Sequence, residues 1–145
     1  MKSSSWDECV EDSASVKISP DKAKARSLIE TAEARLSFLR GNQLSELNAR
    51  FIFEGYYSSV VEVVHALVIL DGFKVDNHIC LGYYLRDAMK WADLFRVFDD
   101  CRYKRNSVVY YGQSMDFDVA RDSIARLSGL FKEIKRVVEA RLGKI

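Results

Sequence analysis

The segment FIFEGYYSSVVEVVHALVIL, residues 51–70, establishes the fold class of this chain. Apolar side chains lie almost all the way round its helical wheel, which is typical of a helix in the middle of a bundle or against a partner chain. Many of its residues are β-branched, so a strand is the alternative. The segment is much longer than an ordinary strand and lacks turn signals. We therefore predict a helix from about residue 44 to residue 70, ended by Asp71-Gly72.

An amphipathic helix is predicted before this segment. Ser19-Pro20 favours a helix start, because serine can cap free backbone amides and proline fits the first helical position. Apolar residues then recur at spacings of three and four, at Leu28, Ala32, Leu36 and Leu39. Gly41-Asn42 is a typical helix end.

Further helical segments are predicted after residue 72. The connection FKVDNH, residues 73–78, leads to a short helical stretch around Ile79 to Leu85. The next helix has an apolar face made of Ala88, Trp91, Ala92, Phe95 and Phe98. The last begins near Phe117 and carries an apolar stripe at Ala120, Ile124, Leu127, Phe131, Ile134 and Val138. We predict an all-α fold, an up-and-down antiparallel bundle of four main helices plus short helical segments.

The length of 145 residues is that of one domain. Residues 1–18 are mostly small and polar around an apolar cluster at Trp6, so we predict a mobile or short helical N-terminal extension there and the bundle in residues 19–145. The chain has 22 Lys and Arg against 21 Asp and Glu, a net charge of +1. This balance excludes a protein that holds nucleic acid by bulk positive charge, but it leaves room for a local basic site.

Cysteine usage and the N-terminus both indicate a cytoplasmic protein. Cys9, Cys80 and Cys101 are far apart and odd in number, so we predict reduced, buried thiols. The first residues lack the apolar core of a signal peptide. The longest apolar stretch, residues 60–70, is short for a membrane span and contains charge-bearing side chains, so no membrane is expected.

Most motifs of cofactor and metal chemistry are absent from the sequence. It contains no GxxxxGK[ST] loop, no HExxH and no GxSxG. Glu62 and His65 have the Glu-x-x-His spacing of di-iron bundles, but such sites need two of these motifs, and the other histidine, His78, has no glutamate three residues before it. We predict that His65 is a structural histidine, and we predict no metal or cofactor.

The segment RYKRNSVVYYG, residues 102–112, is the part of the chain richest in candidate ligand-binding groups. Arginine suits bidentate binding of phosphate, asparagine can read a sugar or base edge, and tyrosine can stack on a base. The candidate nucleotide- or RNA-binding residues are Arg102, Arg105, Asn106, Tyr110 and Tyr111. The alternative is a plain helix end, with cations that complement the helix dipole and tyrosines packed at the edge of the bundle.

Two segments together resemble the HEPN domain family (higher eukaryotes and prokaryotes nucleotide-binding). They are GYYSSVVEVVHALVILDG, residues 55–72, and RNSVVYYG, residues 105–112. The resemblance covers roughly residues 20–140. It implies a helical bundle that forms a homodimer. In many members an arginine and a histidine face a cleft between protomers and cut RNA without metal, as toxins paired with a separately encoded nucleotidyltransferase.

The sequence departs from the catalytic pattern of that family. Arg105 and Asn106 match its arginine and the polar residue after it, but Tyr110 stands where the histidine is expected. Only about one tyrosine in a thousand is deprotonated at neutral pH, so Tyr110 is a poor general base. We predict a non-catalytic HEPN-like module that binds a nucleotide, RNA or a nucleotidyltransferase partner as a homodimer. The alternative is a metal-independent HEPN ribonuclease toxin, and His78 is expected to be structural.

Overall fold

The all-α fold class is confirmed by a computed structural model, which describes residues 3–143. Within these residues lie six α-helices, a π-helical turn and a small two-stranded sheet. In chain order the elements are α1 (Trp6–Glu11), β1 (Ser15–Lys17), α2 (Lys22–Arg40), α3 (Ala49–Leu70), β2 (Phe73–Val75), α4 (His78–Tyr83), η1 (Tyr84–Ala88), α5 (Ala92–Tyr111) and α6 (Phe117–Arg141).

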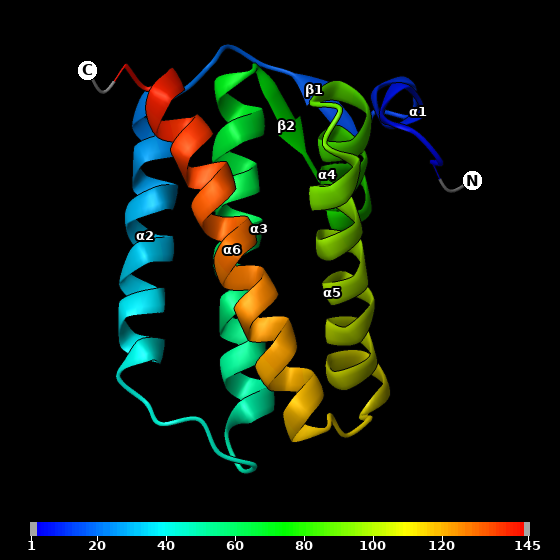
Figure 1. Cartoon of the computed structure of the whole chain (residues 1–145). Helices are drawn as coiled ribbons and strands as arrows, with labels where there is room; N and C mark the ends of the chain where they lie inside the picture. Colours follow the sequence, from blue (N-terminus) through cyan, green and yellow to red (C-terminus); the bar gives the residue numbers. More distant parts are fainter. Residues whose placement is uncertain (1–2, 144–145) are drawn as a thin grey trace.

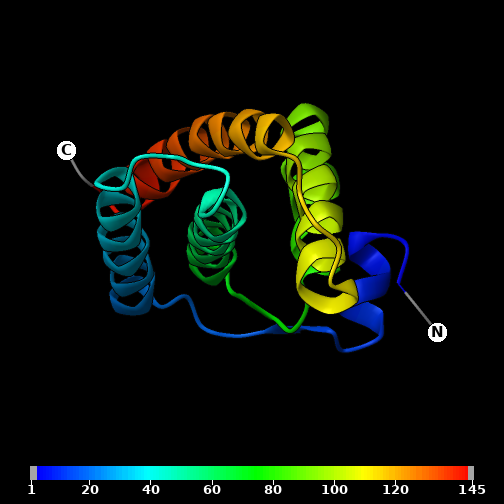
Figure 2. The ribbon, with the colours of Figure 1, turned by 90° about the horizontal axis from the view of Figure 1, so that it is seen from below.

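The helix α3 lies at the centre of the molecule. Seen from below, α2, α6 and α5 form an arc around it (Figure 2), and successive long helices run in opposite directions (Figure 1). Its largest fully buried side chains are Phe53, Tyr57, Val60, Val63 and Leu67. The nearly uniform apolar surface predicted for this helix therefore follows from its enclosure on several sides.

By length and hydropathy α3 is also the one helix in residues 3–143 that could cross a membrane. It has 22 residues, so it is longer than the apolar stretch of residues 60–70 on which the expectation of no membrane span was based. However, 72% of its most apolar part is buried inside the fold, and the core helix of a protein without a membrane span meets the same criterion. Localisation in the cytoplasm stays a prediction.

Three helix starts differ from the prediction. Asp21, not Ser19, caps α2, accepting a hydrogen bond of 3.0 Å from the amide of Lys24. The helix α3 begins at residue 49, because Ser45 and Asn48 form a turn in which the Ser45 amide donates to Asn48 Oδ1 at 2.8 Å.

The third helix start that differs from the prediction is that of α5, which begins after Trp91. Lys90 has a φ of 61°, outside the helical region, so Ala88 and Trp91 belong to the preceding turn and connection. The predicted end of α2 at Gly41 and the predicted start of α6 at Phe117 are both confirmed.

The segment predicted as a plain connection contains a strand. Residues 73–75 form β2, which pairs antiparallel with β1 in the register Ser15↔Val75 and Lys17↔Phe73. The Ile18 amide extends this contact by donating to the carbonyl of Gly72 at 2.9 Å. The partner strand is far away in sequence, so local periodicity gave no sign of the pairing.

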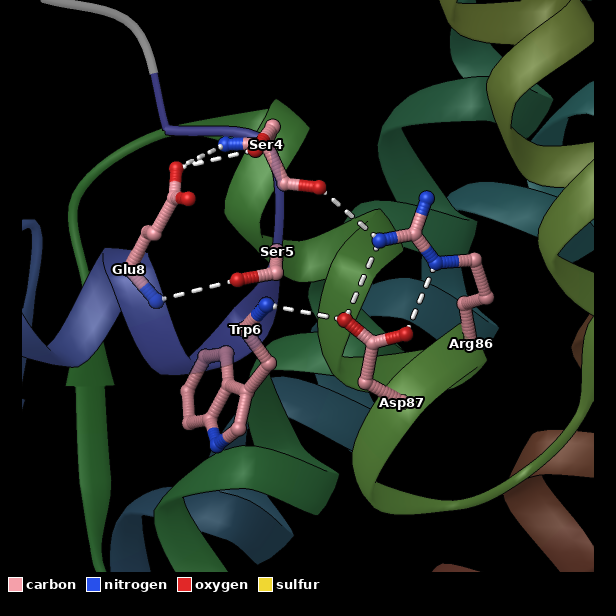
Figure 3. A network of polar contacts seen from close by, with 6 residues as sticks. All are labelled: Ser4, Ser5, Trp6, Glu8, Arg86 and Asp87. Carbon is pink, nitrogen blue, oxygen red and sulfur yellow. Dashed lines mark hydrogen bonds and ion pairs between the residues drawn. The ribbon is translucent and has the colours of Figure 1, made fainter.

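The N-terminal helix α1 is attached to the main body through Trp6. This side chain is buried and meets the rings of Phe73 and Tyr84 edge-on, with centroids 5.2 and 4.9 Å away. Figure 3 shows the polar contacts around it, in which the Trp6 amide donates to Asp87 Oδ2 at 2.9 Å and Arg86 donates to the same carboxylate. The short helical alternative for residues 1–18 thus describes residues 6–11.

The prediction of reduced thiols is wrong for two of the three cysteines. Cys9 in α1 and Cys80 in α4 form a disulfide, with their Cα atoms 6.0 Å apart. They are separated by 71 positions in the sequence, and only the docking of α1 brings them together. Cys101 is free and buried, as predicted. The argument for a cytoplasmic location from reduced thiols therefore no longer applies.

Candidate functional site

The predicted binding segment forms the C-terminal half of α5. The helix ends at Gly112, whose φ of 62° is in the left-handed region that glycine adopts without strain. The last tyrosines, Tyr103, Tyr110 and Tyr111, are 70%, 66% and 76% exposed. They are therefore not packed at the edge of the bundle, which removes one part of the alternative interpretation of this segment.

A shallow depression of about 290 Å³ lies between the start of α4 and the C-terminal half of α5. It is lined by Asn77, His78, Ile79, Arg102, Arg105, Asn106 and Tyr110. Four of the five predicted residues thus meet at one place. The fifth, Tyr111, is not among the lining residues.

Arg105 is the central cation of this depression. Its Nη1 lies 3.3 Å from Tyr110 Oη and 3.4 Å from Asn106 Oδ1. Its guanidinium carbon is 5.3 Å from the centroid of the Tyr110 ring and 5.7 Å from that of Tyr57. Its buried Nε has no hydrogen-bond partner, and no carboxylate of residues 3–143 forms an ion pair with it. Within residues 3–143 the charge of Arg105 is therefore left without a counter-ion.

Arg102 contributes a second guanidinium, but a partly neutralised one. Its Nε donates to Asp99 Oδ1 at 2.9 Å, one turn earlier on α5. Such i, i+3 pairs on a helix are common and individually weak. The depression therefore carries net positive charge, most of it from Arg105.

His78 lines the same depression, although its place in the sequence predicted only a structural role. Asn77 caps α4 by accepting a hydrogen bond of 2.8 Å from the Cys80 amide, and this positions His78 as the first helical residue. His78 Nδ1 shares a hydrogen bond of 3.0 Å with the Tyr57 hydroxyl. A histidine after a capping asparagine could have been found in the sequence, but its proximity to Arg105 could not.

The protonation states of this pair follow from their surroundings. Burial, followed by the positive charges of Arg105, His65 and Arg102, lowers the pKa of His78 to about 4. Burial raises the pKa of Tyr57 above its usual range, against the opposing effect of Arg105. At neutral pH the site therefore contains a neutral imidazole, a neutral phenol and two guanidinium cations.

The Glu-x-x-His pair on α3 has other partners. Glu62 forms an ion pair with Arg35 of α2, with 3.1 Å between Nη2 and Oε2. Burial and then the positive charge of Lys24 lower the pKa of His65. In the part of the chain that the structure describes, no three His, Cys, Asp or Glu side chains are grouped so that they could hold a metal ion.

Comparisons with known proteins leave the family open. No family model, no curated protein and no solved structure matches this chain. The HEPN resemblance of residues 20–140 therefore stays a proposal, and the site is interpreted from its own chemistry.

Proposed function

We propose that this protein is a HEPN-like module that binds a nucleotide or a short single-stranded RNA segment in the depression between α4 and α5, without cleaving it. The observation that carries the proposal is the uncompensated guanidinium of Arg105, beside an exposed tyrosine and an asparagine. A phosphate group would supply the missing counter-ion, since arginine binds phosphate oxygens through two parallel hydrogen bonds.

The neighbours of Arg105 favour a ligand that has a base as well as a phosphate. The ring of Tyr110 is 66% exposed, so one face is open to stack on a base. Asn106 has an amide that can pair with a sugar or base edge. The volume of about 290 Å³ is near the lower limit for small-ligand pockets, which suits one nucleotide unit.

The test is a titration of a fluorescently labelled oligouridylate with the purified protein, followed by anisotropy. Arg105→Ala should weaken binding by at least tenfold, because it removes the main cation of the site. Arg50→Ala is the matched control. It removes the same charge from an exposed arginine that stacks on its neighbour Phe51, 4.8 Å from the ring centroid, and has no ion pair within residues 3–143. Equal affinities of both variants and the parent protein would refute the proposal.

The homodimer and the nucleotidyltransferase partner belong to the same proposal. The exposed tyrosines at the end of α5 and the exposed Val109 support a contact between protomers there. Sedimentation at several concentrations tests the homodimer, and a single species of monomer mass would count against it. The nucleotidyltransferase follows from the HEPN resemblance alone, and co-expression with such a protein from a neighbouring gene tests it.

A metal-independent ribonuclease is the second candidate, and the position of His78 favours it. This histidine lines the same depression as Arg105 and is neutral at pH 7, so it could accept the proton of a ribose 2′-hydroxyl. The 2′-oxygen would then attack the phosphorus to form a 2′,3′-cyclic phosphate, the P–O5′ bond would break, and the protonated His78 would return its proton to the leaving 5′-oxygen. Incubation of RNA with the purified protein in the presence of excess chelator tests this activity. Cleavage that is lost in both Arg105→Ala and His78→Gln would establish it, and intact RNA would refute it.

A further inference from the structure

Among the described residues, His78 is the one histidine that lines the depression. We propose that His78 takes up a proton when a phosphodiester binds there, and that its imidazolium then donates from Nε2 to the phosphate. This inference rests on the proposed function, because it concerns the same ligand in the same site. It adds a ligand-binding residue and a dependence of binding on pH.

The geometry leaves one ring nitrogen of His78 available. Nδ1 is occupied by the Tyr57 hydroxyl at 3.0 Å, and the two ring centroids are 5.6 Å apart. Nε2 has no hydrogen-bond partner within residues 3–143. In the imidazolium both nitrogens are donors, so Nδ1–H would donate to the phenol oxygen and Nε2–H would remain for the ligand.

Within the described residues, the charged groups that act on His78 all disfavour the imidazolium. They are Arg102 and Arg105 of α5 and, when protonated, His65 of α3, while Tyr57 of α3 contacts it as a hydrogen-bond partner. The Tyr57 phenol stays protonated because burial raises its pKa, so it supplies no negative charge. Without a ligand, burial and then the positive charges of Arg105, His65 and Arg102 keep His78 neutral down to acidic pH.

A bound phosphodiester would reverse this balance. Its single negative charge would compensate Arg105, since Arg102 is already paired with Asp99, and it would give Nε2–H an acceptor. An opposite charge within hydrogen-bonding reach favours the charged form of a titratable group. We therefore expect the ligand to raise the pKa of His78 from about 4 to about 6. Binding would then take up about 0.8 proton at pH 5, and the affinity would be about tenfold higher at pH 5 than at pH 7.

The experiment uses the whole chain and a short oligouridylate without terminal phosphate, because its uracil rings and phosphodiesters keep their charge across this pH range. Calorimetric titration at pH 5 in two buffers of different ionisation enthalpy measures the proton uptake. The imidazole C–H signals of the protein, followed by NMR, report the pKa directly. The chain has only two histidines, so His65→Gln assigns the signals and serves as the matched control.

We expect proton uptake and a pH-dependent affinity in the parent protein and in His65→Gln, and neither in His78→Gln. If His78→Gln does not fold, the NMR titration of the parent protein with and without RNA still decides. Binding that is lost in Arg105→Ala but is independent of pH, or a His78 pKa unchanged by RNA, would overturn this inference and leave the proposed function standing. Absence of binding at every pH would overturn both.

Discussion

Two half-buried arginines, Arg35 on α2 and Arg105 on α5, face α3 in different chemical surroundings. Arg35 is paired with the Glu62 carboxylate, and its Nη1 also donates to Ser59 Oγ at 3.2 Å. Ser59 in turn donates to the Ala32 carbonyl at 3.1 Å, so this cluster is closed on itself. Among the described residues, Arg105 has only weak contacts with neutral groups, and its Nε has no hydrogen-bond partner.

The two histidines show the same contrast. His65 is one helical turn from Glu62, whose negative charge partly opposes the effect of burial on its pKa. The charged groups that shift the pKa of His78 are all cations. A polar cluster that neutralises itself contributes to the fold, whereas one that keeps its charge can bind an ion from solution. This difference is our main reason for proposing that the function lies at α5.

The largest expected effect concerns the disulfide between α1 and α4, the helix that carries His78. Replacing both cysteines of the pair, Cys9→Ser with Cys80→Ser, opens a loop of 71 positions. The chain-entropy relation predicts a loss of about 4 kcal/mol in the free energy of unfolding. Urea denaturation of the oxidised parent and the double variant measures it. A loss below about 1 kcal/mol would show that packing around Trp6 already holds α1 in place.

Next comes a substitution that gives Arg105 the kind of partner that Arg35 has. Asn106→Asp places a carboxylate beside its Nη1, at the position now 3.4 Å away. We expect oligouridylate affinity to fall by about thirtyfold and the free energy of unfolding to change by less than about 0.5 kcal/mol. Ser107→Asp adds the same charge outside the depression and should cost far less affinity. Equal losses would mean that only net charge matters.

The reverse substitution removes the partner of Arg35. Glu62→Gln should lower the free energy of unfolding by about 1 kcal/mol, because this ion pair is partly shielded from water, with 31% and 20% of the side chains exposed. RNA affinity should not change. Chemical denaturation and the anisotropy titration together measure both quantities. A loss of affinity without a loss of stability would contradict the contrast between the two clusters.

The smallest effect is the dependence of stability on acid. The unfolded chain protonates His78 near pH 6.5 and the folded chain only near pH 4, so protons favour the unfolded state. Stability should therefore fall as the pH drops from about 6.5 toward 4, with about 1 kcal/mol due to this half-exposed group after allowance for solvent screening. The His78→Gln variant should lack that part of the decline in denaturation experiments at pH 7 and pH 5. An identical decline in both proteins would show that His78 is not responsible.

Local sequence patterns were sufficient to identify the long helices, but not to place all of their starts. The all-round apolar surface of residues 51–70 and the stripe from Ala120 to Val138 reflect the period of the helix, which depends on neighbours three and four positions away. The predicted starts failed at Ser19 and near residue 44, where side-chain caps and a turn compete with helix propensity. The sheet was missed because strands of three residues have no readable period.

In the candidate site, too, residues close in sequence were correctly predicted to lie together, whereas residues brought together by long-range packing were not. Its arginines and Tyr110 lie within about two and a half turns of one helix, so the spacing in the sequence was enough to group Arg102, Arg105, Asn106 and Tyr110. His78, Tyr57 and the disulfide partners come from separate elements, and only long-range packing determines which of them meet. A charge such as that of Arg105 is visible in the sequence, but whether the fold neutralises it depends on every helix packed around it.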